Sequence, residues 1–72
     1  MAVDWQIGRF YKGDAAGFCG LWSENLERWV SDYVDATTYD HFDKAHDVVI
    51  ALNSAFYDRG APYRALVLEK GI

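Results

Sequence analysis

The longest regular pattern in the chain runs from Asp40 to Arg59, where apolar residues recur at alternating spacings of three and four. This spacing places them on one stripe of an amphipathic helix. We expect Asp40 to cap the first turn. Gly60 is expected to close the last turn in the left-handed conformation, with Pro62 preventing the helix from resuming. The stripe consists of Phe42, Ala45, Val49, Leu52 and Phe56, widened on one side by Val48.

Three other stretches have the period or the composition of β-strands. Large apolar side chains alternate with small or polar ones from Val3 to Lys12, and Gly8 is the expected site of a bulge because the phase shifts beyond it. The stretch Phe18 to Trp22 is expected to return along the first strand as a hairpin. The stretch Tyr63 to Glu69 is rich in apolar residues and predicts a final strand.

Residues 26–34 fit two structures. Apolar residues at 26, 29, 30, 33 and 34 suit a short helix capped by Ser23. Alternatively, residues 29–30 and 36–39 form short strands separated by a turn at 31–35. The run Thr37, Thr38 and Tyr39 favours the strands, because β-branched and aromatic residues are enriched in sheets.

Together these elements predict an α+β fold. We expect a small, mostly antiparallel sheet of three to four strands with one amphipathic helix packed on one face. The 72 residues make a single domain, near the lower limit at which a chain buries a sufficient core by itself. Cys19 is the only cysteine, so no internal disulfide can form, which fits a reducing compartment.

The chain has no sequence signal for export or membrane insertion. Its first residues lack the basic region and the apolar run of a signal peptide. Its longest apolar run, residues 48–52, is too short to cross a bilayer. We therefore expect a soluble protein located in the cytoplasm of a host cell, with no membrane partner.

The charge pattern predicts an acidic surface. The net charge is −4 and the sequence pI is about 4.8, which argues against direct binding to nucleic acid. Such a surface attracts basic protein surfaces instead. Seven acids crowd the middle of the chain, opposed only by Arg28 and Lys44. These acids are Glu24, Glu27, Asp32, Asp35, Asp40, Asp43 and Asp47.

Helical spacing indicates which of these residues are available to a partner. Three aspartates fall opposite the core stripe, and two more lie in the turn that leads into the helix. Ile50 and Tyr57 lie to one side of the stripe, where they either form an exposed shoulder or close the edge of the core. The predicted partner-binding residues are Asp32, Asp35, Asp43, Asp47, Asp58 and Tyr57.

No set of residues has the spacing of a catalytic or metal site. Cys19 has no histidine near it in sequence, and a small strand cysteine is more often buried than reactive. His41 and His46 are five residues apart, so on a helix they point in different directions and cannot hold one ion together. The set Asp43, His46 and Asp47 shares one side of the helix but has no second element to complete it. We therefore predict no enzyme activity, no metal and no cofactor.

Two segments resemble a known class of proteins. Residues 29–32 read Trp-Val-Ser-Asp and residues 36–39 read Ala-Thr-Thr-Tyr, followed by Ala45 in the helix. Together with residues 20–23, Gly-Leu-Trp-Ser, this pattern resembles small acidic phage and mobile-element proteins of the anti-CRISPR inhibitor kind. The resemblance implies a phage-encoded inhibitor that binds a bacterial immune complex and blocks it without catalysis.

The sequence thus favours a non-enzymatic inhibitor that occupies a basic, nucleic-acid-binding surface of a bacterial protein complex. Two alternatives stay open. The first is a small interaction module that forms homodimers through an open, aromatic sheet face. The second is a protein that stacks single-stranded nucleic acid on that face, using Arg9, Lys12 and Arg64.

Overall fold

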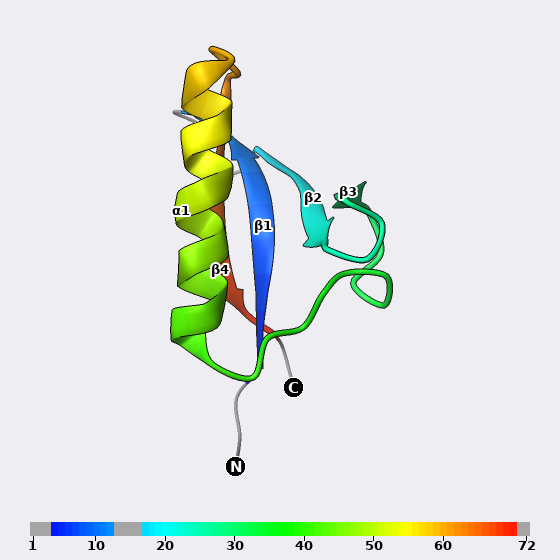
Figure 1. Ribbon diagram of the computed structural model, residues 1–72. Helices are drawn as coiled ribbons and strands as arrows, with labels where there is room; N and C mark the ends of the chain where they lie inside the picture. Colours follow the sequence, from blue (N-terminus) through cyan, green and yellow to red (C-terminus); the bar gives the residue numbers. More distant parts are fainter. Residues whose placement is uncertain (1–3, 13–16, 71–72) are drawn as a thin grey trace.

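The computed structural model describes residues 4–12 and 17–70. They form a four-stranded antiparallel sheet in the order β3-β2-β1-β4, with a single helix on one face (Figure 1). The elements are β1 (Trp5–Tyr11), β2 (Phe18–Ser23), β3 (Arg28–Val30), α1 (Phe42–Asp58) and β4 (Tyr63–Glu69). The predicted α+β fold is confirmed, and residues 28–30 are a strand, not part of a helix.

The start of α1 differs from the prediction. The helix begins at Phe42, and the preceding capping position is taken by His41, whose side chain makes no capping hydrogen bond. Asp40 is therefore one residue too early to cap the first turn. Its carboxylate accepts a hydrogen bond from Lys44 Nζ at 3.1 Å instead, which links the loop to the helix on the outside.

The end of α1 follows the prediction. Gly60 has a φ of 64°, in the left-handed region that glycine enters without steric cost. Its N–H donates to the carbonyl oxygen of Tyr57 at 3.0 Å, and the N–H of Ala61 donates to the carbonyl oxygen of Phe56 at 2.9 Å. These two bonds define a Schellman motif, which satisfies carbonyl groups that the helix end leaves free.

The core lies between α1 and the β1–β4 pair. The predicted stripe is correct for its central residues, but Phe42 is 46% exposed. Its ring meets Trp5 edge-on, with ring centroids 5.3 Å apart, and stacks on His46 of the same helix. Leu52 is half-buried at the side of the stripe. The buried residues of this core are Ile7, Tyr39, Ala45, Val49, Phe56 and Ala65.

The width of a helix explains why α1 covers only part of the sheet. A helix with its side chains is about 10 Å across, and neighbouring strands lie about 4.8 Å apart. One helix therefore covers roughly two strands, and α1 packs on β4 and β1. The helix-facing side of β2 and β3 lies beyond its reach and carries Trp22 and Trp29, which contact the core only from the side.

The bulge in the β1–β2 hairpin lies on the strand opposite to the one predicted. Gly8 pairs with Leu21 and Phe10 pairs with Phe18, so Arg9 of β1 faces two residues of β2, Cys19 and Gly20. Gly20 has a φ of 133°, which suits the extra residue of a bulge. A Cβ at Gly8 would lie 2.6 Å from Leu68 Cδ1, so a larger residue there would require the Leu68 side chain to shift.

The second face of the sheet is partly covered by the loop between β3 and α1. Gln6 points away from the helix because it alternates with buried Ile7 along β1, and its Nε2 donates to the carbonyl oxygen of Tyr33 at 3.0 Å. The loop contributes Ala36 to a second, smaller cluster of apolar residues. That cluster consists of Leu21, Val30 and Ala36, with Leu68 packed against it.

The predicted strand at residues 36–39 is reduced to a single bridge. Tyr39 and Trp5 exchange both backbone hydrogen bonds, at 2.8 and 2.9 Å, and no longer ladder includes this segment. The hydroxyl of Tyr39 donates to Glu24 Oε1 at 2.8 Å. Burial is the main reason that the pKa of Tyr39 is raised above its ordinary value, and this bond to a carboxylate is the next. The segment is thus tied to both β1 and the β2–β3 turn.

The outer edge of β4 is blocked by one side chain of the helix. The Lys70 N–H donates to the carbonyl oxygen of Asp4, and the Lys12 N–H donates to that of Pro62. Hydrogen-bonded and non-hydrogen-bonded pairs alternate along an antiparallel ladder. Ala65, which pairs with Arg9, is therefore in a non-hydrogen-bonded pair, and its N–H and C=O point away from β1. Asn53 takes the place of a further strand there. Its Oδ1 accepts from the Ala65 N–H at 2.7 Å, and its Nδ2 donates to the Ala65 carbonyl at 3.1 Å.

Adjacent helix residues should differ sharply in their effect on stability. Phe56 is 3% exposed and Tyr57 is 80% exposed. Phe56→Ala should lower the free energy of unfolding by about 3–5 kcal/mol, because it removes a buried ring and leaves a cavity. Tyr57→Ala should change it by less than about 0.5 kcal/mol. Urea denaturation of the two variants tests this, and equal losses would show that the helix is rotated from the described position.

The Asn53 amide should stabilise the fold through the strand edge. Asn53→Ala removes both bonds to Ala65 and should lower the free energy of unfolding by about 1–3 kcal/mol. Ser54→Ala is the matched control, since it makes a similar change in helix propensity at an exposed position. Urea denaturation measures both, and an Asn53→Ala protein as stable as the control would contradict the role assigned to the amide.

Candidate functional site

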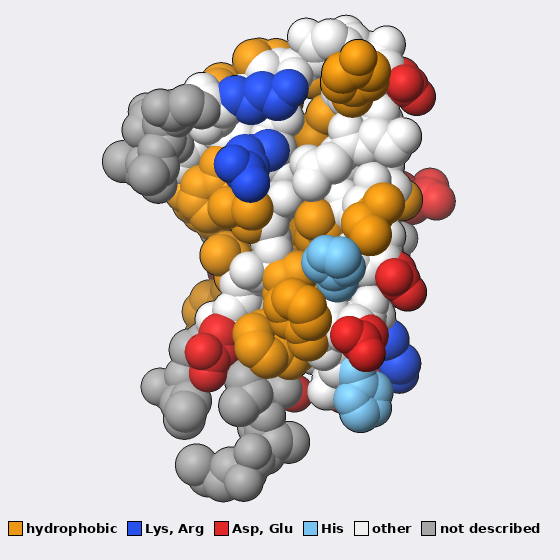
Figure 2. Space-filling model, turned by 90° about the vertical axis from the view of Figure 1, so that its left-hand side faces the viewer, with side chains coloured by type: hydrophobic (Ala, Val, Ile, Leu, Met, Phe, Trp, Pro, Cys, Tyr) orange, Lys and Arg blue, Asp and Glu red, His pale blue; other side chains and the backbone are white. Residues whose placement is uncertain are grey.

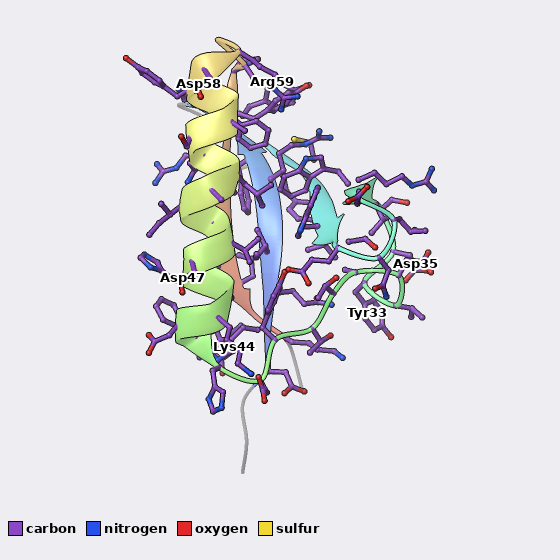
Figure 3. All side chains as sticks on the ribbon, in the orientation of Figure 1. Tyr33, Asp35, Lys44, Asp47, Asp58 and Arg59 are labelled. Atoms are coloured by element: carbon purple, nitrogen blue, oxygen red, sulfur yellow. The ribbon has the colours of Figure 1, made fainter. Side chains whose placement is uncertain are left out.

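The outward side of α1 carries three aspartates, which we call the acidic face: Asp43, Asp47 and Asp58. At 100° per residue these positions fall together on the side opposite the buried stripe. All three side chains are exposed. Figure 3 shows Asp47 and Asp58 on the side of the helix that points away from the sheet. The structure therefore brings these three predicted residues together on one rigid element.

The carboxylates of the acidic face are not neutralised by neighbouring cations. Within residues 4–12 and 17–70, both ion pairs involve Asp40: its carboxylate lies 3.1 Å from Lys44 Nζ and 3.9 Å from His41 Nε2. The hydrogen bond from Lys44 lowers the pKa of Asp40. The acidic face makes no such pair, so its charges are available to an external partner.

Two exposed apolar side chains border the acidic face, and we call them the apolar shoulder: Ile50 and Tyr57. Ile50 is 56% exposed and Tyr57 is 80% exposed, so they form an exposed shoulder and do not close the core. Asn53, which lies between them on the helix, is turned to the edge of β4 instead. Figure 2 shows hydrophobic side chains on this side of the molecule, with acidic side chains along one border.

The two remaining predicted aspartates lie elsewhere. Asp32 and Asp35 are exposed in the loop between β3 and α1, which crosses the sheet face opposite the helix. Figure 3 places Tyr33 and Asp35 far from the outer side of α1. Asp32 Oδ1 also accepts a hydrogen bond from the Val34 N–H at 3.0 Å, which shapes the loop. The six predicted residues thus form two separate surfaces.

Arg9 and Arg64, two of the three basic residues proposed for an open sheet face, lie on opposite faces. Arg9 lies on the helix side, with its guanidinium carbon 5.1 Å from the Trp29 ring centroid and 4.6 Å from that of Tyr63. Arg64 pairs in register with Phe10 and therefore lies on the other face. The alternation of side chains across the sheet separates them. The cluster of cations proposed for a nucleic-acid interface at this face therefore loses Arg9.

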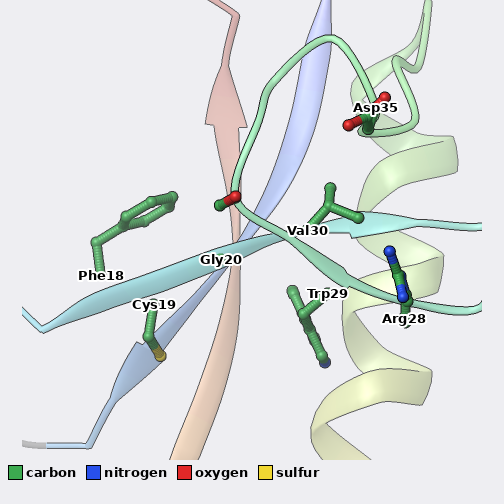
Figure 4. A pocket seen from close by; sticks show the side chains of 8 residues that line it. Phe18, Cys19, Gly20, Arg28, Trp29, Val30 and Asp35 are labelled. Carbon is green, nitrogen blue, oxygen red and sulfur yellow. The ribbon is translucent and has the colours of Figure 1, made fainter.

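A pocket of about 530 Å³ lies beside Cys19, between β2, β3 and the loop that follows (Figure 4). Arg28 and Asp35 contribute charged groups to its lining, but no histidine does. Cys19 Sγ donates to the carbonyl oxygen of Arg9 at 3.4 Å. A nucleophilic cysteine needs a neighbouring base to take its proton, and the lining supplies none. The arrangement is that of a strand cysteine bonded to the backbone of its neighbour.

Metal-binding residues do not converge in the described part of the chain. No group of three or more His, Cys, Asp or Glu side chains there is placed to hold an ion. His46 stacks on Phe42 with ring centroids 5.7 Å apart, which gives this imidazole a packing role. The predictions of no metal and no cofactor therefore remain predictions to be checked by experiment.

No family model, curated protein or solved structure gives a significant match to this chain. The resemblance to anti-CRISPR inhibitors thus remains a hypothesis from the residues. None of the helices in the described residues is both long and apolar enough to cross a membrane. The candidate site therefore rests on geometry and charge: an acidic face beside an apolar shoulder on a single helix.

Removing metal ions should leave the protein unchanged. The melting temperature of the purified chain should be the same with and without a chelator, because no set of ligands converges in the described residues. Differential scanning calorimetry before and after dialysis against the chelator measures this. A drop of many degrees would return attention to Asp43, His46 and Asp47.

Proposed function

We propose that the protein is a non-enzymatic inhibitor that binds a basic surface of another protein through the outer side of α1. The observation that supports this most directly is the acidic face, whose exposed carboxylates pair with no cation in the described residues. Asp43 and Asp47 are four residues apart on the helix, so their like charges repel each other at a small cost to stability. A basic partner would bring positive charges beside these carboxylates, so that attraction to the partner offsets their mutual repulsion.

The apolar shoulder gives the same surface a means of holding its partner. Charge complementarity acts mainly on the rate of encounter, whereas buried apolar and aromatic side chains slow dissociation. Tyr57 is suited to this role because its ring is large and has few rotatable bonds. A helix is also a rigid support, so little conformational entropy is lost when it docks.

The class of partner follows from charge and from the resemblance. A surface that normally holds nucleic acid is basic, and an acidic protein competes for it by imitating the phosphate charge. We therefore propose a bacterial immune complex as the target, with the protein acting in the cytoplasm of the host cell. Asp32 and Asp35 would add to the negative field during the approach without touching the same surface.

A second candidate is homodimerisation through the sheet face opposite the helix. Phe18 is 49% exposed there and contacts Phe10, with ring centroids 5.5 Å apart. An apolar dimer of this kind should respond little to salt, whereas an encounter steered by charge should slow as salt rises. Sedimentation at several salt concentrations distinguishes the two functions.

Two charge reversals of equal size separate contact from steering. Asp47→Lys changes the acidic face, and Asp35→Lys makes the same change in the loop on the other side of the molecule. Both should slow association with the target complex at low salt. Only Asp47→Lys should also speed dissociation, by an amount that corresponds to about 1 kcal/mol of lost rim contact. Surface plasmon resonance against a target recovered from a bacterial lysate measures both rates.

The result also decides which surface binds. Equal dissociation rates for wild type and Asp47→Lys would exclude the acidic face as the contact surface. Faster dissociation confined to Asp35→Lys would assign the contact to the loop between β3 and α1 instead. Circular dichroism of both variants provides the control that each remains folded.

A further inference from the structure

A groove runs along the other flank of α1, where the helix does not cover β2 and β3. Its volume is about 850 Å³. Leu52 and Phe56 form the wall on the helix, and Trp22 and Trp29 form the wall on the sheet, with Tyr63 between them. This flank lies on the opposite side of the buried stripe from Ile50 and Tyr57. The groove is therefore separate from the apolar shoulder, and it meets the acidic face only at Asp58, which also lines it.

The groove is lined by a continuous series of aromatic rings. The ring centroids of Trp22 and Trp29 are 5.3 Å apart, and those of Trp29 and Phe56 are 5.8 Å apart with only 24° between the planes. Phe56 in turn lies 5.8 Å from Tyr63. Both tryptophans are only half-buried. Large rings that already contact one another lose little freedom on binding and are typical anchors of interfaces.

Three of the four arginines in the chain also line this groove: Arg9, Arg28 and Arg59. Among the residues that the structure describes, the acids in its lining are Glu27 and Asp58, so arginines outnumber acids here in a chain of net charge −4. Arg28 and Arg59 are exposed, and the guanidinium carbon of Arg59 lies 5.8 Å from the Phe56 ring centroid. Figure 3 shows Arg59 at the C-terminal end of α1, on the side toward the sheet.

Arg9 is held in place before any ligand arrives. Its Nε and Nη2 both donate to the carbonyl oxygen of Cys19, at 3.2 and 2.8 Å, and its guanidinium lies against the rings of Trp29 and Tyr63. Cys19 is one of the two residues that the bulge in β2 places opposite Arg9. A guanidinium fixed in this way loses little entropy when an anion approaches.

We propose that this groove binds a short segment of a partner protein in which an aromatic or aliphatic side chain is flanked by carboxylates. The apolar side chain would lie against the half-buried Leu52 and Trp29, and the carboxylates would face Arg28 and Arg59. Trp, Tyr and Arg are the residues that contribute most to protein interfaces, and this groove concentrates them. The inference goes beyond the proposed function and does not depend on it.

Single-stranded nucleic acid is the less suitable occupant, although bases also stack on tryptophan and arginine. A polyphosphate backbone would pass Glu27 and Asp58 in the lining and, beyond the groove, would meet the other carboxylates of the acidic face. One or two carboxylates on a peptide need only the local match to the arginines. The charge distribution therefore favours an acidic peptide.

The indole N–H signals of the three tryptophans provide a direct test in heteronuclear NMR spectra of the full chain. The probe is the peptide acetyl-Glu-Phe-Glu-amide, compared with acetyl-Lys-Phe-Lys-amide and with octathymidylate. The Trp22 and Trp29 signals should shift in a saturable manner with the acidic peptide. The Trp5 signal should not, because that ring packs on Phe42 away from the groove.

Two variants test the role of the arginines. The double substitution Arg28→Gln, Arg59→Gln at exposed positions should weaken binding of the acidic peptide about tenfold by removing charge-assisted bonds. Arg64→Gln on the other face is the matched control and should bind as wild type does.

Three outcomes would overturn the proposal. The first is that the indole N–H signals of Trp22 and Trp29 do not shift at millimolar concentrations of the acidic peptide. The second is that these signals shift equally with the basic peptide. The third is saturable binding of octathymidylate in preference to the peptide, which would assign the groove to nucleic acid.

Discussion

The pairing of the first strand with the last is the constraint on which the rest of the structure depends. β1 and β4 pair in register over seven residues, and α1 brings the chain back between them. A helix of 17 residues is about 25 Å long, close to the length of a seven-residue strand. One helix therefore covers the whole β1–β4 pair and nothing more. The hairpin of β2 and β3 has to be stabilised by other means.

Those means are polar and aromatic contacts that belong to no regular element. The loop after β3 crosses the uncovered face and is held by Gln6, while Tyr39 extends the pairing of β1. On the helix side, the Arg9 guanidinium packs against the rings of Trp29 and Tyr63 at the floor that α1 leaves uncovered. A domain of this size completes its core with such contacts because it lacks the residues for another layer.

Because α1 covers only β1 and β4, its two sides carry different kinds of surface. One side of α1 carries the acidic face and the apolar shoulder, which are free because they point to solvent. The other flank borders the groove, where the arginines gather. The sign of the charge thus changes around the helix, so the protein can present different chemistry to two partners without moving. The net charge of the chain conceals this local difference.

Periodicity in the sequence determined the elements: the apolar spacing of α1, its end at Gly60, and the alternation in β1 follow from local geometry. It also placed Asp43, Asp47 and Asp58 together, because residues on one helix keep fixed angles. Tertiary structure decided the features that depend on contacts between residues distant in sequence. The bulge opposite Arg9, the Asn53 bonds to Ala65, and the separation of Asp32 and Asp35 from the acidic face each require contacts distant in sequence. No local pattern specifies which strand, edge or face a side chain will meet.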